Sequence, residues 1–322
     1  MKILIVGGTG TLGQHVLPLL LQNKEIERIR VLSRDEHKQA HAAQKFNSDR
    51  IDWILGDVRD RERVFKATKG CSGVFMFAAT KSVDAAEYNP MEAVKTNIEG
   101  AHHVVEACIE NRVSKAIITS TDKACSPCTL YGATKLVGEK IFIQGNIGSH
   151  NSRFAACRYG NVLGSHGSVL EKWERAREEG KSFGMTDPNM TRFWILPHRA
   201  AEFVVDCFYR FTGAEVFIPK MKSSTMADLL KAYTLFHGDD RYDFEVIPKR
   251  AGEKEHEALI SMDEMPFVTE EEDRFIKWPT HRLFPFMEKG KQVELKEPYT
   301  SENAPRHPVQ DLVSYIRLLE LA

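Results

Sequence analysis

The sequence predicts an α/β fold, a Rossmann-like doubly wound parallel sheet with a smaller C-terminal domain. Short β-rich runs alternate with helical patterns through the first half of the chain, which is typical of a parallel sheet with helices on both faces. After about residue 161 the alternation loosens and prolines recur. That change favours a smaller domain placed over the carboxyl edge of the sheet.

The same alternation sets the predicted elements in order. Strands are expected at Lys2–Val6, Arg28–Leu32, Ile51–Leu55, Gly73–Phe77, Lys115–Ser120 and Arg153–Tyr159. Helices are expected at about 11–23, 35–46, 60–69, 90–111, 130–146, 198–212 and 309–321. We therefore expect a Rossmann domain over residues 1–165, with a helical contribution from about 195–215, and a substrate-binding domain mainly over 166–322.

Composition places the chain among ordinary globular proteins. It has 322 residues, of which 42% are hydrophobic and 28% charged, and its 44 Lys and Arg balance 45 Asp and Glu. This balance argues against a nucleic-acid or membrane-surface partner, and no apolar run approaches the roughly 18 residues that span a bilayer. The six cysteines lie mostly in apolar patterns, which favours a reducing compartment. We expect a cytoplasmic protein.

A glycine-rich turn follows the first predicted strand. Gly7, Gly10 and Gly13 are spaced Gly-x-x-Gly-x-x-Gly and open the first helix. Glycines at this place allow a tight turn and let a pyrophosphate approach backbone N–H groups at a helix N-terminus. We expect a dinucleotide to bind here, with contacts that include the intervening residues Thr9, Thr11 and Leu12.

The next strand ends indicate which dinucleotide binds. After the second strand the chain reads Ser33-Arg34-Asp35, where Ser33 and Arg34 can hold a 2′-phosphate, so NADP is favoured although Asp35 is typical of NAD sites. Asp57 and Val58 follow the third strand and can face the adenine. Ala78 and Ala79 follow the fourth strand and let backbone approach the cofactor, with Lys81 just beyond.

Two groups of polar residues indicate the chemistry. Tyr131 and Lys135 lie four residues apart on a predicted helix, where the ammonium can lower the phenol pKa for proton exchange with a substrate alcohol. Thr121 supplies the nearby hydroxyl, and Asp122 and Lys123 add an acid and a base. A site with both a redox pair and an acid–base pair can perform elimination as well as oxidation.

Other attractive motifs have simpler interpretations. Cys125 and Cys128 form a Cys-x-x-Cys that could be a redox pair or half of a zinc site, but no second Cys-x-x-Cys or His pair at metal spacing exists. The pair can also simply line the site. Glu255-His256-Glu257 lacks the second His of a metalloprotease helix, so we expect no metal.

These motifs resemble the extended branch of the short-chain dehydrogenase/reductase superfamily. More narrowly, the chain looks like the soluble, inverting UDP-N-acetylglucosamine 4,6-dehydratases of polysaccharide biosynthesis. Large membrane-bound relatives typically have Met at the place of Tyr131. The resemblance runs in order from residue 2 to about 278, with a weaker similarity at 299–303. It is carried by segments 33–36, 56–60, 87–90, 121–124, 130–135, 158–162, 190–194 and 250–254.

The resemblance implies a mechanism and a set of contacts. NADP⁺ takes hydride from sugar C4 while Tyr131 accepts the 4-hydroxyl proton, Lys123 removes the C5 proton, Asp122 protonates the departing 6-hydroxyl, and hydride returns to C6. Lys123 must be partly neutral, which we expect burial to promote. Arg192 and Arg250 suit the diphosphate. Further implied substrate contacts are Lys81, Glu87, Asn161, Lys220 and Glu253. A homo-oligomer, dimer or hexamer, is expected.

Departures from the family pattern fall in the sugar pocket. Ser126 and Cys128 replace residues that are often Asn or another polar type, and segments 77–84 and 170–173 also differ. Two alternatives therefore stay open. One is a sugar-nucleotide 4-epimerase or 4-ketoreductase that uses only Tyr131 and Lys135, and the other is a non-catalytic NADP-sensing protein.

Overall fold

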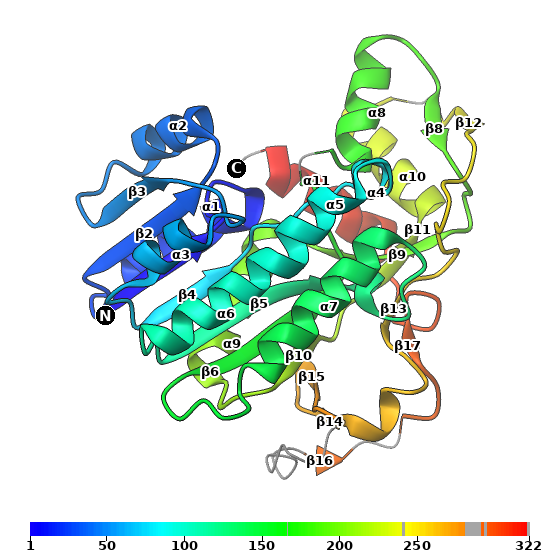
Figure 1. Cartoon of the computed structure of the whole chain (residues 1–322). Coiled ribbons are helices and arrows are strands. Elements are labelled where there is room, and N and C mark those ends of the chain that lie inside the picture. The colour runs from blue at the N-terminus through cyan, green and yellow to red at the C-terminus, as the bar shows by residue number, and fades with distance from the viewer. Residues whose placement is uncertain (166, 240–241, 281–290, 293–294, 321–322) are drawn as a thin grey trace.

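A mixed sheet runs through the middle of the molecule (Figure 1). The computed structural model describes residues 1–165, 167–239, 242–280, 291–292 and 295–320, and within these ranges the sheet has ten strands. Their spatial order is β3-β2-β1-β4-β5-β6-β10-β15-β14-β16. The parallel strands are β1 (Lys2–Val6), β2 (Arg28–Ser33), β3 (Ile51–Leu55), β4 (Gly73–Met76), β5 (Lys115–Thr121), β6 (Arg153–Tyr159) and β10 (Val216–Pro219).

The six strands predicted from sequence are confirmed, with ends that shift by one residue at most. The order reverses at β1 and β4, where one half of the sheet grows toward β3 and the other toward β10. Ligands bind at such a switch point beyond the carboxyl ends of the strands. Gly7 directly follows β1, Asp122 directly follows β5, and Ala78 lies close beyond β4. The predicted site residues therefore gather at this edge of the sheet.

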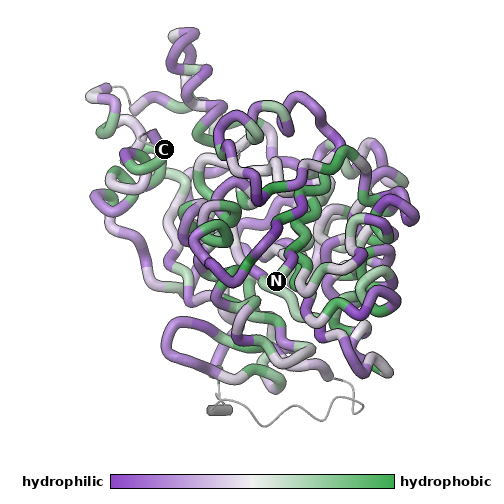
Figure 2. The backbone as a smooth tube through the Cα atoms, turned by 90° about the vertical axis from the view of Figure 1, so that its left-hand side faces the viewer, coloured by the Kyte–Doolittle hydropathy of each residue, from purple (hydrophilic) through white to green (hydrophobic). Residues whose placement is uncertain are grey.

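Helices cover both faces of the sheet, which explains its continuous apolar strands. α3 (Arg61–Thr68), α6 (Gly100–Glu110) and α7 (Leu130–Gln144) lie on the face toward the viewer in Figure 1. α1 (Thr11–Gln22) and α9 (Pro197–Arg210) contact each other on the opposite face, and α2 (Glu36–Phe46) follows β2. Ile3, Leu4 and Ile5 of β1 are fully buried between these layers. Figure 2 shows hydrophobic segments toward the middle and mostly hydrophilic outer turns.

The helix predicted over 90–111 contains a change of pitch. It begins as α5 (Pro90–Val94), continues through the π-helical segment η1 (Lys95–Glu99), and ends as α6. The buried Asn97 lies in the π-helical segment, and its side chain bonds Thr80 N and O and donates to Thr134 Oγ1 at 2.9 Å. The extra residue of the π turn thus ties the loop after β4 to α7.

The remaining helices build a second lobe (upper right in Figure 1). It holds α8 (Val169–Glu178), α10 (Met226–His237) and α11 (Val309–Glu320), with the parallel pair β8 (Phe183–Met185) and β12 (Phe244–Val246). Its separate core centres on Trp173, Phe183 and Tyr233. The helix predicted at 309–321 is found as α11, and residue 321 lies outside the described residues. α8, α10 and the short α4 (Val83–Tyr88) were not predicted.

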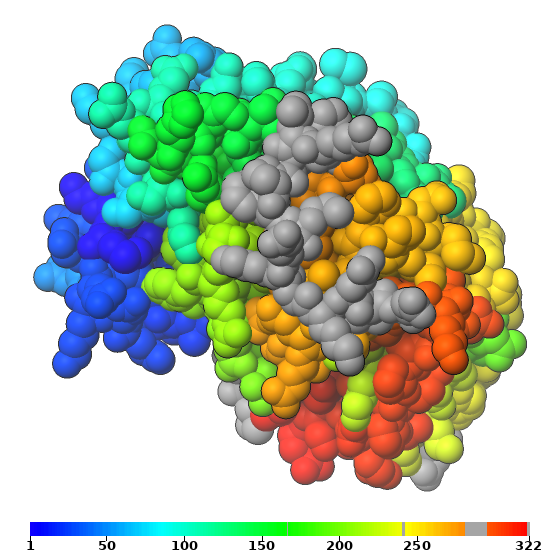
Figure 3. Space-filling view, turned by 90° about the horizontal axis from the view of Figure 1, so that it is seen from below, coloured from blue at the N-terminus to red at the C-terminus, as the bar shows by residue number. Residues whose placement is uncertain are grey.

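Late segments return to the sheet. β15 (Arg274–Lys277) pairs antiparallel with β10, followed by β14 (Val268–Glu270) and β16 (Lys291–Gln292). Seen from below, the N-terminal residues (blue) and the C-terminal residues (orange and red) lie on opposite sides of the molecule (Figure 3). In the sheet, β10, β15, β14 and β16 lie beside strands of the first 165 residues. The predicted division into domains at residue 165 stays a prediction.

Small additional sheets carry residues that lie near the carboxyl ends of the main parallel strands. β7 (Asn161–Val162), β9 (Thr191–Ile195) and β11 (Ser223–Thr225) form a three-stranded sheet, and β13 (Ala258–Ile260) pairs with β17 (Tyr299–Thr300). A single 3-10 turn, η2 (Asp122–Ala124), follows β5. Among the described residues, no helix has the length and apolar character required to span a bilayer.

Candidate active site

The turn after β1 depends on glycine at two places. Gly7 has φ +85°, and a Cβ there would lie 2.5 Å from the backbone N of Ala78. A Cβ on Gly13 would lie 2.4 Å from the carbonyl O of Gly8. Gly10 is the N-cap of α1 and has no side chain to bond the first N–H groups of the helix. Thr9 is buried, and Thr11 and Leu12 are half-buried beside these donors, so the turn suits a dinucleotide pyrophosphate.

Three polar residues at the end of β2, Ser33, Arg34 and Asp35, have different partners. Gln39 Nε2 donates to the carbonyl O and to Oγ of the buried Ser33, both at 2.9 Å. Asp35 is the N-cap of α2 and accepts from Lys38 N at 3.0 Å, and this bond lowers the pKa of Asp35. Its carboxylate is therefore used by the helix. Arg34 is exposed and offers a cationic side chain at this corner, as does Lys38, whose Nζ lies 3.9 Å from Asp35.

The loops after β3 and β4 complete the predicted cofactor edge. Burial raises the pKa of Asp57, but its bonds to Arg59 (Nη2 at 2.7 Å and backbone N at 2.9 Å) outweigh burial and lower it. Val58 is buried beneath Gly100. Ala78 N donates to Val6 O at 2.9 Å, which brings this loop and neighbouring Ala79 against the glycine turn. Lys81 is exposed.

Four of the five predicted catalytic residues form one connected group at the end of β5. Thr121 Oγ1 donates to Asp122 Oδ1 at 2.9 Å, and Lys123 Nζ lies 3.0 Å from the same oxygen. Thr121 also hydrogen-bonds Tyr131 on the first turn of α7. Burial raises the pKa of Tyr131, while the charge of Lys123 and the Thr121 bond lower it. Lys123, not Lys135, is therefore the cation that acts most strongly on the phenol.

Lys135 lies one turn further along α7. It is buried, and its Nζ donates to the carbonyl O of Thr119 at 2.6 Å. Burial lowers the pKa of Lys135 to about 8, although the charge of Glu139 opposes this shift. The group can thus change its protonation near neutral pH.

The expectation that burial leaves Lys123 partly neutral is wrong for this structure. Burial does lower the pKa of Lys123, but the charges of Asp122 and Glu257 outweigh burial and raise it. Glu257 Oε1 lies 3.4 Å from Lys123 Nζ, and Asn161 Oδ1 lies 3.3 Å from it. Lys123 is therefore held as an ammonium between two carboxylates.

A pocket of about 130 Å³ opens beside Lys123. Four residues predicted as substrate contacts line it, namely Asn161, Arg192, Arg250 and Glu253, and their contact with a substrate stays a prediction. The lining also includes Val83, Cys128, Thr129, Ala251, Gly252, Lys254 and Glu257.

The other predicted substrate residues do not line this pocket. Glu87 Oε1 accepts from Leu130 N at 2.7 Å at the start of α7. Lys220 Nζ donates to Glu272 O at 3.0 Å and pairs with Glu270 at 2.8 Å, which holds it beside β14. Lys81 is also absent from the lining. Contacts of these three residues with a substrate stay a prediction.

The two lining arginines differ in what they can offer. Arg192 is buried, with Nη1 donating to Thr191 O at 2.7 Å and Glu255 O at 3.1 Å and Nη2 to Lys254 O at 2.9 Å. Its donors thus hold the pocket wall. Arg250 is exposed, 3.6 Å from Asp84. Arg250 is therefore better placed than Arg192 to meet a diphosphate.

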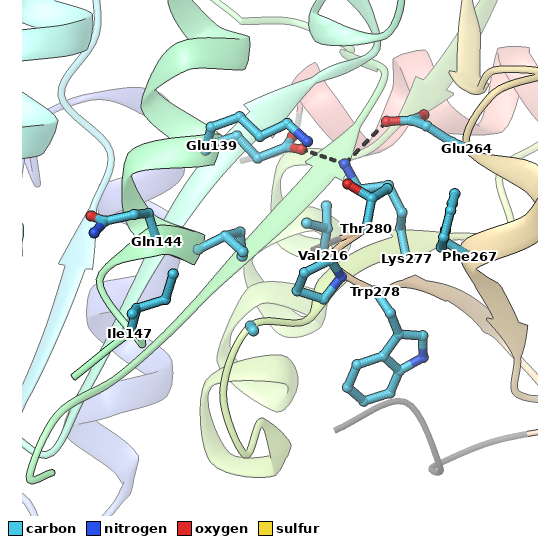
Figure 4. A pocket seen from close by; sticks show the side chains of 13 residues that line it. Glu139, Gln144, Ile147, Val216, Glu264, Phe267, Lys277, Trp278 and Thr280 are labelled. Atoms are coloured by element: carbon cyan, nitrogen blue, oxygen red, sulfur yellow. Dashed lines mark hydrogen bonds and ion pairs between the residues drawn. The ribbon is translucent and has the colours of Figure 1, made fainter. Parts of the chain in front are cut away.

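A larger cavity of about 300 Å³ lies elsewhere and contains none of the predicted site residues. Its wall includes Glu139, Glu264 and Lys277, whose side chains converge in Figure 4. Lys277 Nζ bonds Glu139 Oε1 at 2.9 Å and Glu264 Oε1 at 3.0 Å, and Arg158 bonds both carboxylates. This ionic cluster joins α7, β6 and β15 and has a structural role.

The structure also separates the two cysteines. Cys125 is buried with Sγ 3.5 Å from Glu264 Oε2, and burial raises its thiol pKa to about 12. Cys128 is exposed and lines the pocket, and both are free thiols. No group of acidic, His and Cys side chains within the described ranges could hold a metal.

Two site residues were missed by sequence reasoning. In the sequence, Glu257 was considered only as part of a possible metal motif. In the structure it matters because it lies beside the buried Lys123. Asn97 had no signal, because the π-helical turn that aims it at Thr80 and Thr134 is not visible in the helical pattern.

Comparison with known proteins identifies the family of this chain. Residues 3–278 match the family described as polysaccharide biosynthesis protein. The chain is 42% identical over 316 residues to UDP-N-acetylglucosamine 4,6-dehydratase (inverting) of Campylobacter jejuni subsp. jejuni, which covers 94% of this chain and 93% of the relative. It is also 34% identical over 331 residues to UDP-glucose 4-epimerase of Rickettsia massiliae, covering 99% and 96%.

Solved structures show the same architecture. The X-ray structure of Pen from Bacillus thuringiensis has a TM-score of 0.91 and 34% identity, and the match covers 100% of this chain and 98% of that one. DesIV of Streptomyces venezuelae, a dTDP-glucose 4,6-dehydratase with NAD bound, has a TM-score of 0.72 at 17% identity over 79% and 86%, which shows the fold alone. The chain therefore belongs to the polysaccharide biosynthesis protein family of extended short-chain dehydrogenases/reductases.

Proposed function

We propose that this chain is an NADP-dependent UDP-N-acetylglucosamine 4,6-dehydratase, a hydro-lyase that forms a UDP-4-keto-6-deoxy-N-acetylhexosamine. One observation carries the proposal: Thr121 and Asp122 connect the redox tyrosine to a separate acid and base within hydrogen-bond distance. Oxidation of an alcohol needs only Tyr131, Lys135 and a hydroxyl. Asp122 and Lys123 have no use in that reaction, but elimination requires both.

The residues divide the reaction between them. Tyr131 accepts the proton of the sugar 4-hydroxyl, assisted by Thr121. The resulting 4-ketone acidifies the C5 proton, which Lys123 removes, and Asp122 gives a proton to the departing 6-hydroxyl. A bound nicotinamide dinucleotide supplies the hydride acceptor at C4 and the hydride donor at C6, so no external reductant is needed.

The glycine turn and the end of β2 would hold that cofactor. A nicotinamide dinucleotide fits the close approach of Gly7 to Ala78 and the N-terminus of α1. We favour NADP because Asp35 caps α2 and leaves exposed Arg34 as a charged group for a 2′-phosphate. DesIV, at lower similarity, holds NAD.

Mass spectrometry of UDP-N-acetylglucosamine incubated with the protein and NADP⁺, without reductant, tests the proposal. We expect the sugar to lose one water. An unchanged mass would contradict the dehydratase. It would favour a non-catalytic NADP-binding protein or a 4-epimerase, the activity in the name of the Rickettsia relative. A product that forms only with added NADPH would indicate a 4-ketoreductase.

The stereochemistry follows from the more similar relative. The Campylobacter protein is named an inverting enzyme, and we extend that outcome at C5 to this chain. Couplings between ring protons in the NMR spectrum of the product report the C5 configuration. Retention of the starting configuration would contradict inversion and leave the dehydratase standing.

The proposal also includes a homo-oligomer, a dimer or hexamer, that acts in the cytoplasm. Light scattering after size-exclusion chromatography measures the mass of the assembly. A monomer of 36.6 kDa would contradict this part of the proposal.

A further inference from the structure

Glu257 is a buried carboxylate that the reaction described above does not use. Its residue is 3% exposed, and Oε1 lies 3.4 Å from Lys123 Nζ. Among the described residues, the other oxygen, Oε2, is buried and has no hydrogen-bond partner. The side chain lines the same pocket as Lys123 and Asn161. Glu257 thus faces the reacting groups with one oxygen still free.

The backbone around Glu257 is held firmly. Its N–H donates to Ser301 Oγ at 2.9 Å, and its carbonyl accepts from Ser301 N at 2.7 Å. Ser301 is fully buried and also bonds Thr191. These contacts hold the carboxylate beside Lys123 from a part of the chain that is far away in sequence.

The charges around Lys123 are unequal. Asp122 and Glu257 place two carboxylates beside one ammonium, and one oxygen of each is buried without a partner. Other ionisable groups that face this cluster are Tyr131, Arg192, Arg250, Glu253 and Lys254.

The elimination needs two separate proton exchanges, and this inference rests on the proposed function. Tyr131 takes the 4-hydroxyl proton while its own phenolic proton passes through the Thr121 hydroxyl to Asp122, and Asp122 then gives that proton to the departing 6-hydroxyl. Thr121 bonds both residues and so connects that exchange. The C5 proton is taken by Lys123, which must first lose a proton of its own. Since Asp122 is already used by the first exchange, the second needs another acceptor.

We propose that Glu257 is this acceptor: it takes a proton from Lys123 and so makes Lys123 a neutral base for C5. An Nζ–H bond breaks and an Oε1–H bond forms, with no change in the charge of the pair. Lys123 then takes the C5 proton, and the electron pair left on C5 forms the double bond as the protonated 6-hydroxyl leaves.

The cycle closes without protons from solvent. After it removes the C5 proton, the Lys123–Glu257 pair holds one proton more than at the start. The pair returns one proton to C5 when hydride reaches C6. Tyr131 ends protonated and Asp122 ionised, as they began. Glu257 acts on the substrate through Lys123 and is therefore a positioning residue for that base.

Glu257→Gln tests the inference, because it keeps the shape of the side chain and removes its ability to accept a proton. In single turnovers in deuterated water, absorbance of the reduced nicotinamide reports C4 oxidation, and mass spectrometry reports deuterium at C5 and loss of water. We expect C4 oxidation within about twofold of the parent, and C5 labelling near pH 6 to fall about a hundredfold, the low end for loss of general base catalysis.

The pH profile separates a proton role from a structural one. In the parent, C5 labelling should vary little between about pH 6 and 9, because the proton passes within the pair. In Glu257→Gln, Lys123 must release its proton to solvent, so labelling should rise about tenfold per pH unit. Glu257→Asp, which keeps a carboxylate, should restore the flat profile, and Glu255→Gln, an exposed neighbour with the same charge change, should match the parent.

Two outcomes would overturn the inference. One is a Glu257→Gln profile with the parent's labelling rate at every pH. The other is an equal loss of C4 oxidation and C5 labelling with no pH slope, which would mean that Glu257 only maintains the fold. If the parent itself never loses water, the proposed function fails instead, and this is seen before any variant is compared.

Discussion

Single residues in this site owe their behaviour to neighbours that are distant in sequence. Lys123 is held as an ammonium by the adjacent Asp122 and also by Glu257, which is far along the chain and lies 3.4 Å from its Nζ. The pKa of Tyr131 is lowered by Lys123 and Thr121 more than by its helical neighbour Lys135, which instead donates to the carbonyl O of Thr119. The proton chemistry of the site therefore depends on η2 and on the segment before β13.

Tyr131→Phe and Lys123→Ala should fail at different steps. Without the phenol the 4-hydroxyl proton has no acceptor, so C4 oxidation should fall by about 10²- to 10⁴-fold. Lys123→Ala should still accumulate reduced nicotinamide but release no water. Single-turnover absorbance distinguishes the two variants, and Tyr209→Phe, a half-exposed tyrosine, is the control. Identical behaviour of both variants would refute the division of roles.

Arg34→Ala should weaken NADP binding much more than NAD binding. Only NADP carries the 2′-phosphate, and a charged hydrogen bond of this kind contributes about 1.5–3 kcal/mol, or about 10- to 150-fold in Kd. Titration calorimetry with both cofactors measures the difference, and Lys45→Ala on exposed α2 is the matched loss of charge. Equal weakening of the two cofactors would show that Arg34 does not contact the phosphate.

Sequence reasoning found the residue types of the site but not their partners. The glycine turn, Thr121–Lys123 and Tyr131–Lys135 are visible because their spacing within one segment fixes their geometry. Glu257 and Asn97 are not, since each acts across a contact between segments that pair only in the fold. The expected neutral Lys123 was wrong for the same reason: burial was visible in the pattern, but the second carboxylate was not.

At the scale of elements, α7 and η2 hold the proposed catalytic residues and pack together as one unit. Thr129 caps α7 by accepting from Gly132 N at 3.1 Å, and a Cβ on Gly132 would lie 2.1 Å from Lys123 O. The missing side chain lets the helix that holds Tyr131 and Lys135 lie directly against the turn that holds Asp122 and Lys123.

Gly132→Ala should therefore separate the two elements. We expect a loss of about 1–3 kcal/mol in the free energy of unfolding, as for overpacked cores, and at least a tenfold fall in kcat. Urea unfolding and steady-state kinetics measure these changes. Val137→Ala, at a site 40% exposed on the same helix, should change stability by less than about 0.5 kcal/mol. Full activity in Gly132→Ala would show that the contact is not needed.

Elements with strong periodicity were predicted, including α11 of the second lobe, but α8 and α10 of that lobe were not. α10 nevertheless has clear local signals, because Thr225 caps it by accepting from Asp228 N at 3.0 Å and Gly238 ends it with φ +61°. Recurring prolines on either side of α10 interrupt the helical pattern in which these caps stand. The return of β14, β15 and β16 to the sheet could not be predicted, since their short runs fix neither partner nor direction.

At the scale of the whole molecule, one buried ionic cluster ties late segments to the core. Glu264 accepts from Arg158 Nη1 at 2.7 Å and Nη2 at 2.9 Å and from Lys277 at 3.0 Å. Burial raises the pKa of Glu264, but Arg158 and Lys277 outweigh burial and lower it to about 2. The carboxylate thus joins β6 and β15 through the loop before β14.

Glu264→Gln should destabilise the protein by about 3–5 kcal/mol at pH 7, because it leaves two buried cations with one carboxylate. A lowered carboxyl pKa contributes stability above its ordinary value of 4.5, and this is lost as pH falls toward about 2. The gap between parent and variant in urea unfolding should therefore shrink below about pH 4.5. Glu62→Gln, on an 83% exposed side chain, is the control. A gap that does not change with pH would contradict the ionic origin.

The path of the hydride tests the central claim most directly. The protein is incubated with NADP⁺ and UDP-N-acetylglucosamine that carries deuterium at C4, mixed with unlabelled substrate and no reductant. We expect the sugar to lose water and the product to carry the deuterium at C6, as NMR and mass spectrometry report. Deuterium that returns to C4, or that never leaves it, would contradict a dehydratase built from Tyr131, Asp122 and Lys123.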